Sequence, residues 1–254
     1  MARKLLPDIV SLTPSSYESF VRCHRLFLLG HLLGVPASDP IPTPDRGQLV
    51  HELLRFVHER GNCRDNAHVE EVLSAHGVAD DVHRTMFRRH AERCPEVVDA
   101  GAHEKDIARF HRFPAPMFMA NARIDAIWVH DGILDARDYK TGQRWHDRVA
   151  DDPAAQVQAF VLAPHAQRRG LRLRIRYEYL APEIDDDPDP FEPDDDDLEA
   201  IAARLHGAVH SMFSQESWRG CGEAQICRTC RYRSICADSA ATGEPEWAAL
   251  GLRQ

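Results

Sequence analysis

Apolar residues recur at helical spacing in the first third of the chain. Residues 14–33 begin after a capping threonine with a first-turn proline, and the hydrophobic face that follows predicts one helix. Residues 47–59 carry leucine and valine at every third or fourth position, which predicts a second. Two shorter and more polar patterns, at 67–75 and 80–92, also have helical periodicity. We therefore expect two helices followed by a small helical insert at about residues 62–95.

Strand-forming residues dominate the middle of the chain. Residues 117–129 and 133–139 are rich in them, and His130-Asp131-Gly132 between the two is typical of a hairpin turn. Residues 171–179 alternate apolar side chains with arginine or glutamate, the pattern of a half-buried strand. Further helices are expected over 154–168 and 197–213. The sequence thus predicts a hairpin, a helix, a strand and a helix in succession.

Length and composition favour one domain. The chain has 254 residues, a mass of 28.8 kDa and 43% hydrophobic residues, which is enough to bury a core and excludes a disordered chain. We find no internal repeat and no second domain boundary within residues 1–254. The longest apolar stretch, at 26–35, is interrupted by His31 and is shorter than the ~20 residues of a membrane span. With no signal peptide recognised either, we expect a cytoplasmic protein without membrane contact.

The negative charge is concentrated in one segment. Residues 183–197 contain ten carboxylates and no basic residue, and without them the net charge of −9 becomes +1. We interpret this run as a solvated acidic loop; the alternative is that it imitates DNA and shields a basic groove. The rest of the chain does not argue against an anionic partner. Arg172, Arg174 and Arg176 on the alternating strand could follow a phosphate backbone, or they could form a solvated strand face.

Three residues of the predicted hairpin combine two carboxylates with an amine. In Asp138-Tyr139-Lys140 the outer side chains share one face of the strand, and Asp125 lies on the partner strand. Two carboxylates on neighbouring strands suit a hard divalent cation such as Mg²⁺, which retains waters and leaves positions for phosphate oxygens. A nearby ammonium can orient the water or neutralise charge on the phosphate. Taken alone, this spacing is also typical of a surface ion pair at a strand end.

Three motifs together resemble the RecB-like branch of the PD-(D/E)xK nuclease superfamily. They are Ile124-Asp125, Asp138-Tyr139-Lys140-Thr141-Gly142 and Gln156-Val157-Gln158-Ala159-Phe160. The resemblance extends from Cys23 to Cys236 and implies a single α/β nuclease domain with a restriction-endonuclease-like core, in which a mixed central sheet is flanked by helices. Phe160 replaces the tyrosine that normally ends the family's glutamine motif, so the ring remains and its hydroxyl is lost.

The resemblance also implies roles for individual residues. In this family a histidine on an upstream helix, in a G-x3-H setting, joins the metal ligands, and the segment from Gly47 to His51 fits that motif. The implied ligands of Mg²⁺ or Mn²⁺ are Asp125, Asp138, His51 and the backbone carbonyl of Tyr139. Lys140 would position or activate the attacking water, and Gln156 would orient the substrate or Lys140. Without the hairpin, His51 would be interpreted as a solvated or core histidine.

Four cysteines have the spacing of a second metal site. Cys227-x2-Cys230-x5-Cys236 lies near the end of the chain, and Cys23 lies some two hundred residues earlier. A C-x2-C pair brings two sulfurs to one centre, and the spacing alone allows either zinc or an iron–sulfur cluster. The arrangement resembles the iron–sulfur staple of AddB-type and CRISPR-associated RecB-like exonucleases. That resemblance implies a [4Fe-4S] cluster that joins the first helix to the Cys-rich tail.

Three cysteines remain outside this set. Cys221 lies six residues before Cys227 and could compete as a ligand within the Cys-rich tail, residues 221–236. Cys63 and Cys94 are interpreted as plain thiols of a reducing compartment.

These features together predict a metal-dependent DNA nuclease. The resemblance implies an exonuclease that acts on single-stranded DNA or on DNA ends in repair, recombination or CRISPR adaptation. The chain has no G-x4-G-K-[ST] loop, so it would need a helicase or another repair or CRISPR protein as partner to process long duplexes. The alternative is a non-catalytic or partner-dependent DNA-end binding module of a helicase–nuclease or defence complex. The complete set of His51, Asp125, Asp138 and Lys140 argues against the non-catalytic form, since degenerate nucleases usually lose one of these.

Overall fold

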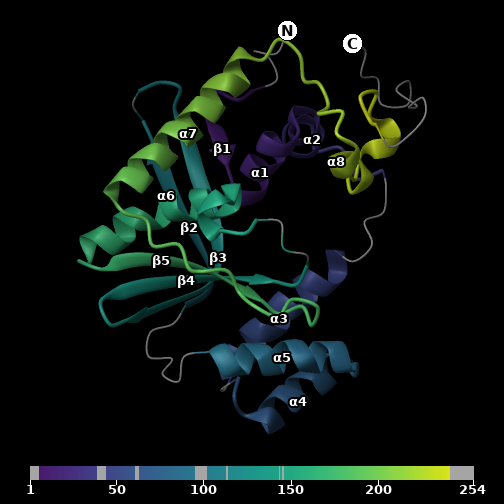
Figure 1. The fold of residues 1–254 in the computed structure, drawn as a ribbon, viewed down its shortest axis with the longest axis vertical. Helices are drawn as coiled ribbons and strands as arrows, with labels where there is room; N and C mark the ends of the chain where they lie inside the picture. Colours follow the sequence, from purple (N-terminus) through teal and green to yellow (C-terminus); the bar gives the residue numbers. More distant parts are fainter. Residues whose placement is uncertain are drawn as a thin grey trace.

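A long strand, β3, organises the sheet in this computed structural model. β3 (Phe118–His130) pairs antiparallel with β2 (Ala102–His111) along one edge. Its other edge is shared by β1 (Val10–Leu12), parallel near the start of β3, and by β4 (Ile133–Lys140), antiparallel near its end. β5 (Arg172–Tyr179) extends the sheet parallel to β4 (Figure 1). The structure describes residues 6–38, 44–60, 63–94, 102–112, 114–142, 144 and 146–240.

One face of the sheet is covered by α6 (Pro153–Arg168), which contacts β3 and β5. Two further helices, α1 (Pro14–Arg22) and α7 (Asp195–Ser214), pack against α6. α6 begins with a proline in its first turn, and the Asp152 side chain caps it by accepting a hydrogen bond from the Ala154 N–H. Nearly all of its residues are buried, so this helix forms the centre of the larger hydrophobic core.

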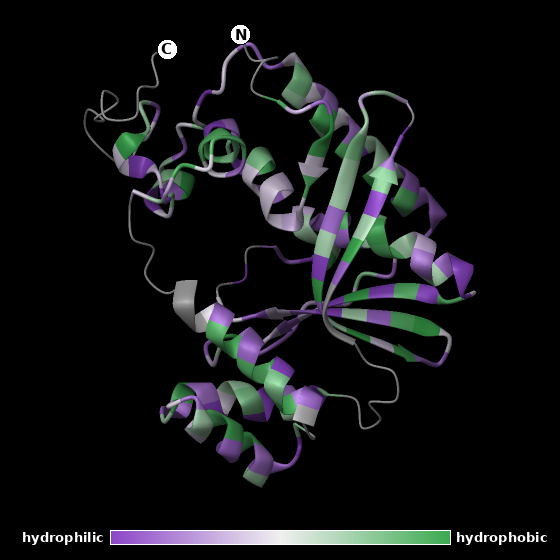
Figure 2. Cartoon of the chain, turned by 180° about the vertical axis from the view of Figure 1, so that it is seen from behind, coloured by the Kyte–Doolittle hydropathy of each residue, from purple (hydrophilic) through white to green (hydrophobic). Residues whose placement is uncertain are grey.

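The opposite face carries the helical insert. α3 (Pro44–Arg60) lies between the sheet and two helices, α4 (Asn66–Ala75) and α5 (Asp81–Arg93), below the sheet in Figure 1. A second core joins them to Trp128 on β3 and to Tyr139 on β4. The coloured cartoon shows the resulting alternation of hydrophobic and hydrophilic bands along α3 and the strands (Figure 2). The expected mixed sheet flanked by helices is therefore confirmed.

The hairpin between β3 and β4 follows its sequence signal closely. Asp131 and Gly132 have φ angles of 49° and 72°, the left-handed conformation that both central residues of this tight turn require. Strand pairing continues from His130 with Ile133 to Ala126 with Arg137. The hairpin therefore sets the register that brings Asp125 beside the end of β4.

The first predicted helix differs from the observed structure. Instead of one helix over residues 14–33, the chain breaks at Cys23, whose backbone is extended with φ −166° and ψ 118°. α2 (His24–Phe27) begins directly after it and continues as a π-helical turn, Leu28–Leu32. The break turns Cys23 out of the helical repeat, toward the cysteine-rich tail.

Two strands of the sheet were not expected from the sequence. β1 has only three residues, and charged residues at 104–106 and 109 interrupt the alternation of apolar and polar residues in β2.

α7 begins at Asp195, two residues before its predicted start, because Asp194 forms a capping box with Asp197. None of the described helices is long and apolar enough to cross a membrane. The remaining short elements are Val149–Asp151, α8 (Ala224–Arg228) and Arg233–Ile235.

Candidate active site

Side chains from α3, β3 and β4 meet where the two strands of the hairpin lie against the helix. His51 on α3 directs Nδ1 to Asp125 Oδ1 at 3.2 Å and Nε2 to the Tyr139 carbonyl at 2.8 Å. Asp125 Oδ2 also accepts from the Tyr139 N–H at 2.8 Å. Both nitrogens of His51 therefore face oxygen acceptors, an arrangement that uses both ring protons.

A glycine allows α3 to approach the end of β4 this closely. A Cβ atom at Gly47 would lie 2.9 Å from Thr141 Oγ1, which is inside van der Waals contact. Gly47 is one helical turn before His51, so its missing side chain brings the histidine to the strand. This contact gives the G-x3-H spacing a physical reason.

Asp138 and Lys140 are joined on the other side of the cluster. Lys140 Nζ lies 2.8 Å from Asp138 Oδ1 and 4.2 Å from the centre of the Tyr177 ring. The Gln158 amide of α6 donates to Asp138 Oδ2 at 2.8 Å. The Asp138 and Lys140 side chains are only 15% and 27% exposed, so a solvated surface ion pair does not describe them.

Burial and neighbouring charge shift the ionisation of this cluster. Burial opposes charging of His51, but its hydrogen bond and its attraction to Asp125 raise the pKa of the imidazole. Burial and the nearby Asp138 carboxylate raise the pKa of Asp125, although His51 acts in the opposite direction. Burial of Lys140 is outweighed by Asp138, which raises the pKa of the ammonium above its usual range. The ionisation of His51, Asp125 and Lys140 is thus set by burial and by the charges of their neighbours.

The donors of this cluster fit a hard divalent cation. His51, the Asp125 carboxylate and the Tyr139 carbonyl meet directly, and the Asp138 carboxylate is close enough to influence the pKa of His51 and Asp125. Such an oxygen-rich set suits Mg²⁺ or Mn²⁺. Each carboxylate oxygen retains lone pairs beyond its present hydrogen bond. Tyr139 contributes its backbone N–H and carbonyl, and its ring lies on the insert face of β4, edge-to-face with the His51 imidazole at 5.9 Å between centroids.

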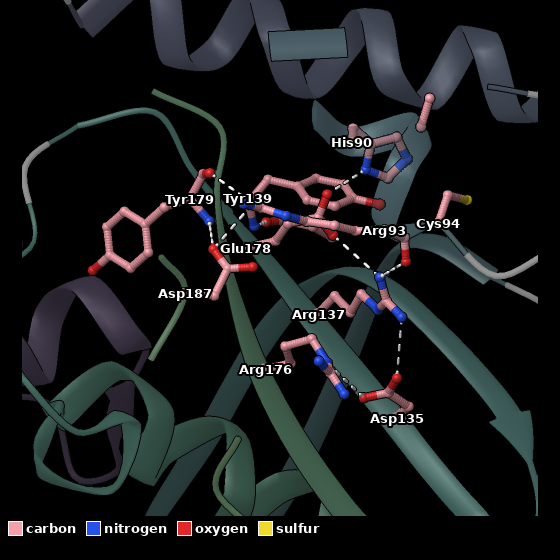
Figure 3. A network of polar contacts seen from close by, with 12 residues as sticks. His90, Arg93, Cys94, Asp135, Arg137, Tyr139, Arg176, Glu178, Tyr179 and Asp187 are labelled. Atoms are coloured by element: carbon pink, nitrogen blue, oxygen red, sulfur yellow. Dashed lines mark hydrogen bonds and ion pairs between the residues drawn. The ribbon is translucent and has the colours of Figure 1, made fainter. Parts of the chain in front are cut away.

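A second polar network lies behind β4, on the face that carries the insert. His90 on α5 donates from Nδ1 to Glu178 Oε1 at 2.7 Å, and Arg137 donates to Glu178 Oε2 at 3.2 Å (Figure 3). Arg137 also contacts Asp135 at 3.4 Å. Burial would lower the pKa of His90, but Glu178 raises it to about 9. The sequence signal of this network is the pair Asp135 and Arg137, two charged residues on one face of β4 that alternate with the apolar Leu134 and Ala136.

Gln156 does not reach the cluster. We expected its amide to face the substrate or Lys140, but its Nε2 donates to the Ala150 carbonyl at 3.1 Å and its Oε1 accepts from Arg204. Gln158, which is 3% exposed, contacts Asp138 instead. The two glutamines are two positions apart on α6, so they point in different directions around the helix. The sequence motif gave no reason to select Gln158.

The arginine row on β5 is also separate from the cluster. Arg172 and Arg174 both bind Glu192 of the acidic loop, at 3.0 and 2.6 Å. Arg176 lies 3.9 Å from Asp135, on the face of the sheet opposite Asp138. The expected phosphate contact is therefore not supported, because these guanidinium groups face carboxylates of the same chain.

Five cysteines line one pocket between α2 and the tail. Cys23, Cys221, Cys227, Cys230 and Cys236 all border it, and α8 lies beside α2 in Figure 1. Burial, reinforced by neighbouring thiols, raises the pKa of Cys221 and of Cys236 to about 11. Two backbone hydrogen bonds connect the N-terminal segment to the C-terminal part of the chain. The Arg25 N–H donates to the Arg219 carbonyl at 3.1 Å, and the Ser38 N–H donates to the Arg231 carbonyl at 3.0 Å. Five thiols around one pocket fit a thiolate-held metal centre.

The mixed central sheet flanked by helices is consistent with the core of the PD-(D/E)XK nucleases. The family model of the PD-(D/E)XK nuclease superfamily matches residues 11–237. The chain belongs to this superfamily. The matched residues include strands of the sheet, the helical insert and the cysteine-rich tail.

Comparison with solved structures agrees at the level of the fold. A candidate exonuclease from Eubacterium rectale is 11% identical, with 87% of each chain covered and a TM-score of 0.52. The structure of SSO0001 is 14% identical, with 90% of this chain and 86% of that chain covered, but its TM-score of 0.44 carries no argument. No curated protein sequence matches this chain.

Proposed function

We propose that this protein is a deoxyribonuclease that hydrolyses phosphodiester bonds with Mg²⁺ or Mn²⁺. One observation carries the proposal: His51 contacts Asp125 and the Tyr139 carbonyl at 3.2 and 2.8 Å, and Asp138, paired with Lys140 at 2.8 Å, is close enough to influence the pKa of both His51 and Asp125. Asp125, Asp138, His51 and the Tyr139 carbonyl would hold the cation. When bound, such a cation lowers the pKa of a coordinated water and offsets charge on the phosphate.

The chain's own residues have separate tasks in this proposal. Asp138 is fixed at both oxygens, by Lys140 and by Gln158, which keeps its carboxylate in one orientation. Lys140 carries a positive charge beside that carboxylate, where it would orient the attacking water and stabilise negative charge developing on the phosphate. His51 would orient or ligate through one ring nitrogen while the other keeps its partner.

We further propose that cleavage begins at DNA ends and prefers single strands. The support is the resemblance of the motifs to RecB-like exonucleases. A role in repair, recombination or CRISPR adaptation, with a helicase or another protein as partner, belongs to the same proposal. Linear and circular single-stranded DNA of equal length distinguish the modes, because an exonuclease degrades only the linear form.

The catalytic proposal is tested by cleavage of end-labelled DNA with and without Mg²⁺ or Mn²⁺. Lys140→Ala should reduce the rate by about 10²–10³-fold, the cost of removing one charge-stabilising group, while circular dichroism and melting stay close to wild type. Equal cleavage by wild type and Lys140→Ala would indicate a contaminating nuclease and remove the assignment. DNA that binds wild type but stays intact with either metal would favour the DNA-end binding module.

We also propose that the five-cysteine pocket holds a [4Fe-4S] cluster through Cys23, Cys227, Cys230 and Cys236. What supports this is the shared pocket and the turn at Cys23 toward the tail. Iron and sulfide analysis of anaerobically purified protein should give four of each per chain. Cys23→Ser should lose the cluster and Cys221→Ser should keep it. If Cys221→Ser loses the cluster and Cys23→Ser keeps it, Cys221 is the fourth ligand. If the purified protein contains zinc and no iron, the site is a zinc site and not an iron–sulfur cluster.

A further inference from the structure

Four side chains outside the proposed nuclease site meet at the base of the helical insert. His58 lies near the end of α3 and Cys63 just beyond it, while His90 lies near the end of α5 and Cys94 caps that helix. Their ligand atoms all lie within 4.8 Å of one another. Cys63, His90 and Cys94 are at most 2% exposed, and His58 is 9% exposed.

We propose that His58, Cys63, His90 and Cys94 bind one structural zinc ion. Two imidazoles and two thiols form a tetrahedral N₂S₂ set, a common ligand combination for Zn²⁺ in proteins. Four protein ligands leave no position for a water or a substrate, so the ion is structural rather than catalytic. In this proposal Cys63 and Cys94 are metal ligands and not the plain thiols expected from the sequence.

The observed distances are close to those of a tetrahedral site. With Zn–N of about 2.0–2.1 Å and Zn–S of about 2.3 Å, ligand atoms should be about 3.3–3.8 Å apart. His58 Nε2 lies 2.8 Å from His90 Nε2 and 3.9 Å from Cys94 Sγ. Since no two ligand atoms are more than 4.8 Å apart, side-chain shifts of up to about an ångström would complete the shell. The 2.8 Å separation also suits a hydrogen bond between two imidazoles, which is the competing explanation.

The group that holds His90 has the form of a second coordination shell. A zinc-bound histidine usually donates its other ring N–H to a carboxylate, which fixes the tautomer and the ring orientation. His90 does this with Glu178 at 2.7 Å (Figure 3). Its Nε2 lies 2.8 Å from His58 Nε2. Arg137 balances the charge of Glu178 at 3.2 Å, so the carboxylate remains ionised beside a neutral Zn(Cys)₂(His)₂ unit.

The ligand pairs lie where the insert leaves the nuclease core and where it returns. His58 and Cys63 precede α4, and His90 and Cys94 end α5, so one ion would close the insert into a loop. His58 is also seven residues, or two turns, after His51 on α3. A zinc ion bound to His58 would therefore fix the position of α3, the helix that carries His51. The effect on His51 rests on the proposed nuclease function, whereas the zinc site itself does not.

Metal analysis of the full chain tests the zinc site independently of DNA cleavage. Wild type purified without chelator should contain one zinc per chain by elemental mass spectrometry. Cys63→Ser and Cys94→Ser should each lose that zinc and keep the iron of the tail. Cys227→Ser is the matched control, because it removes a cysteine of the other site and should lose iron while retaining zinc.

A second measurement on wild type covers the case in which the serine variants do not fold. Zinc removal by a chelator should lower the melting midpoint by about 10 °C, and one equivalent of Zn²⁺, but not Mg²⁺, should restore it. Substitution by Co²⁺ should give the visible absorption of a tetrahedral site with thiolate ligands. Wild type without zinc, and without a melting shift when zinc is added, would overturn the proposal. Zinc that is lost only in Cys227→Ser would overturn it as well.

Discussion

Gln158 provides the sharpest test of how Asp138 is held. Its amide donates to Asp138 Oδ2 at 2.8 Å, and the side chain is 3% exposed. Methionine has a similar unbranched shape and no hydrogen-bond donor of this kind, so Gln158→Met removes the bond with little change in packing. Gln156→Met on the same helix is the matched variant, because the amide of Gln156 contacts Ala150 and Arg204 instead.

The magnitude follows from the charge of the acceptor. A hydrogen bond to an ionised group contributes about 1.5–3 kcal/mol, and about 1.4 kcal/mol corresponds to a factor of ten. Lys140 continues to hold Asp138 Oδ1, so part of the orientation survives. We therefore expect Gln158→Met to lower cleavage at limiting Mg²⁺ by about 10- to 100-fold, which is also the usual effect of losing a group that orients a metal ligand.

Initial cleavage rates over a Mg²⁺ titration measure this effect, with circular dichroism as a check on folding. Gln158→Met should shift the half-saturating Mg²⁺ concentration upward, whereas Gln156→Met should keep it near the wild-type value. Gln156→Met is still expected to melt somewhat lower, because it leaves the Ala150 carbonyl and the Arg204 guanidinium without the amide. If Gln156→Met loses activity and Gln158→Met does not, the family motif is the better guide and the reasoning from contacts is refuted.

Three further predictions concern α3 and the cores. Gly47→Ala should reduce the cleavage rate severalfold, because the added Cβ would lie 2.9 Å from Thr141 Oγ1 and push α3 away from β4. Adding Thr141→Ala to the same chain should restore the rate. If it does not, this contact is not the reason for the loss of activity. Phe160→Tyr should lower stability by about 1–3 kcal/mol in urea unfolding, because this side chain is 1% exposed; unchanged stability would reveal a partner for the hydroxyl. Trp128→Ala should cost about 3–5 kcal/mol, measured in the same way.

Much of the fold could be predicted because its elements have strong local signals. The β3–β4 turn needs two residues with positive φ, and Asp131-Gly132 supplies them. β5 alternates in sequence because only one side of it faces α6. β2 could not be found in this way, since its charged side chains interrupt the alternation and its place is fixed by pairing with β3. The local periodicity of a sequence does not predict which distant strands pair.

The nuclease cluster was predictable where it depends on strand geometry. Asp138 and Lys140 share a face because they are two residues apart in β4. The choice between Gln156 and Gln158 depends instead on the rotation of α6, which the sequence does not specify. The insert cluster could not be foreseen either, since Cys63 and Cys94 are brought together only by the packing of α4 and α5.

The two faces of β4 explain why charged residues are buried behind the nuclease cluster. Asp138 and Lys140 point to α6, while Arg137 and Tyr139 point to the insert. Replacing a buried ion network by apolar residues is often neutral or stabilising. A gain in folding stability therefore does not explain why Arg137 and Glu178 are charged. A shift of one residue in strand register would, however, exchange the two faces and place Arg137 where Asp138 belongs. We infer that pairing Arg137 with Glu178 makes this register the favoured one, and that it keeps Asp138 and Lys140 directed at the cluster.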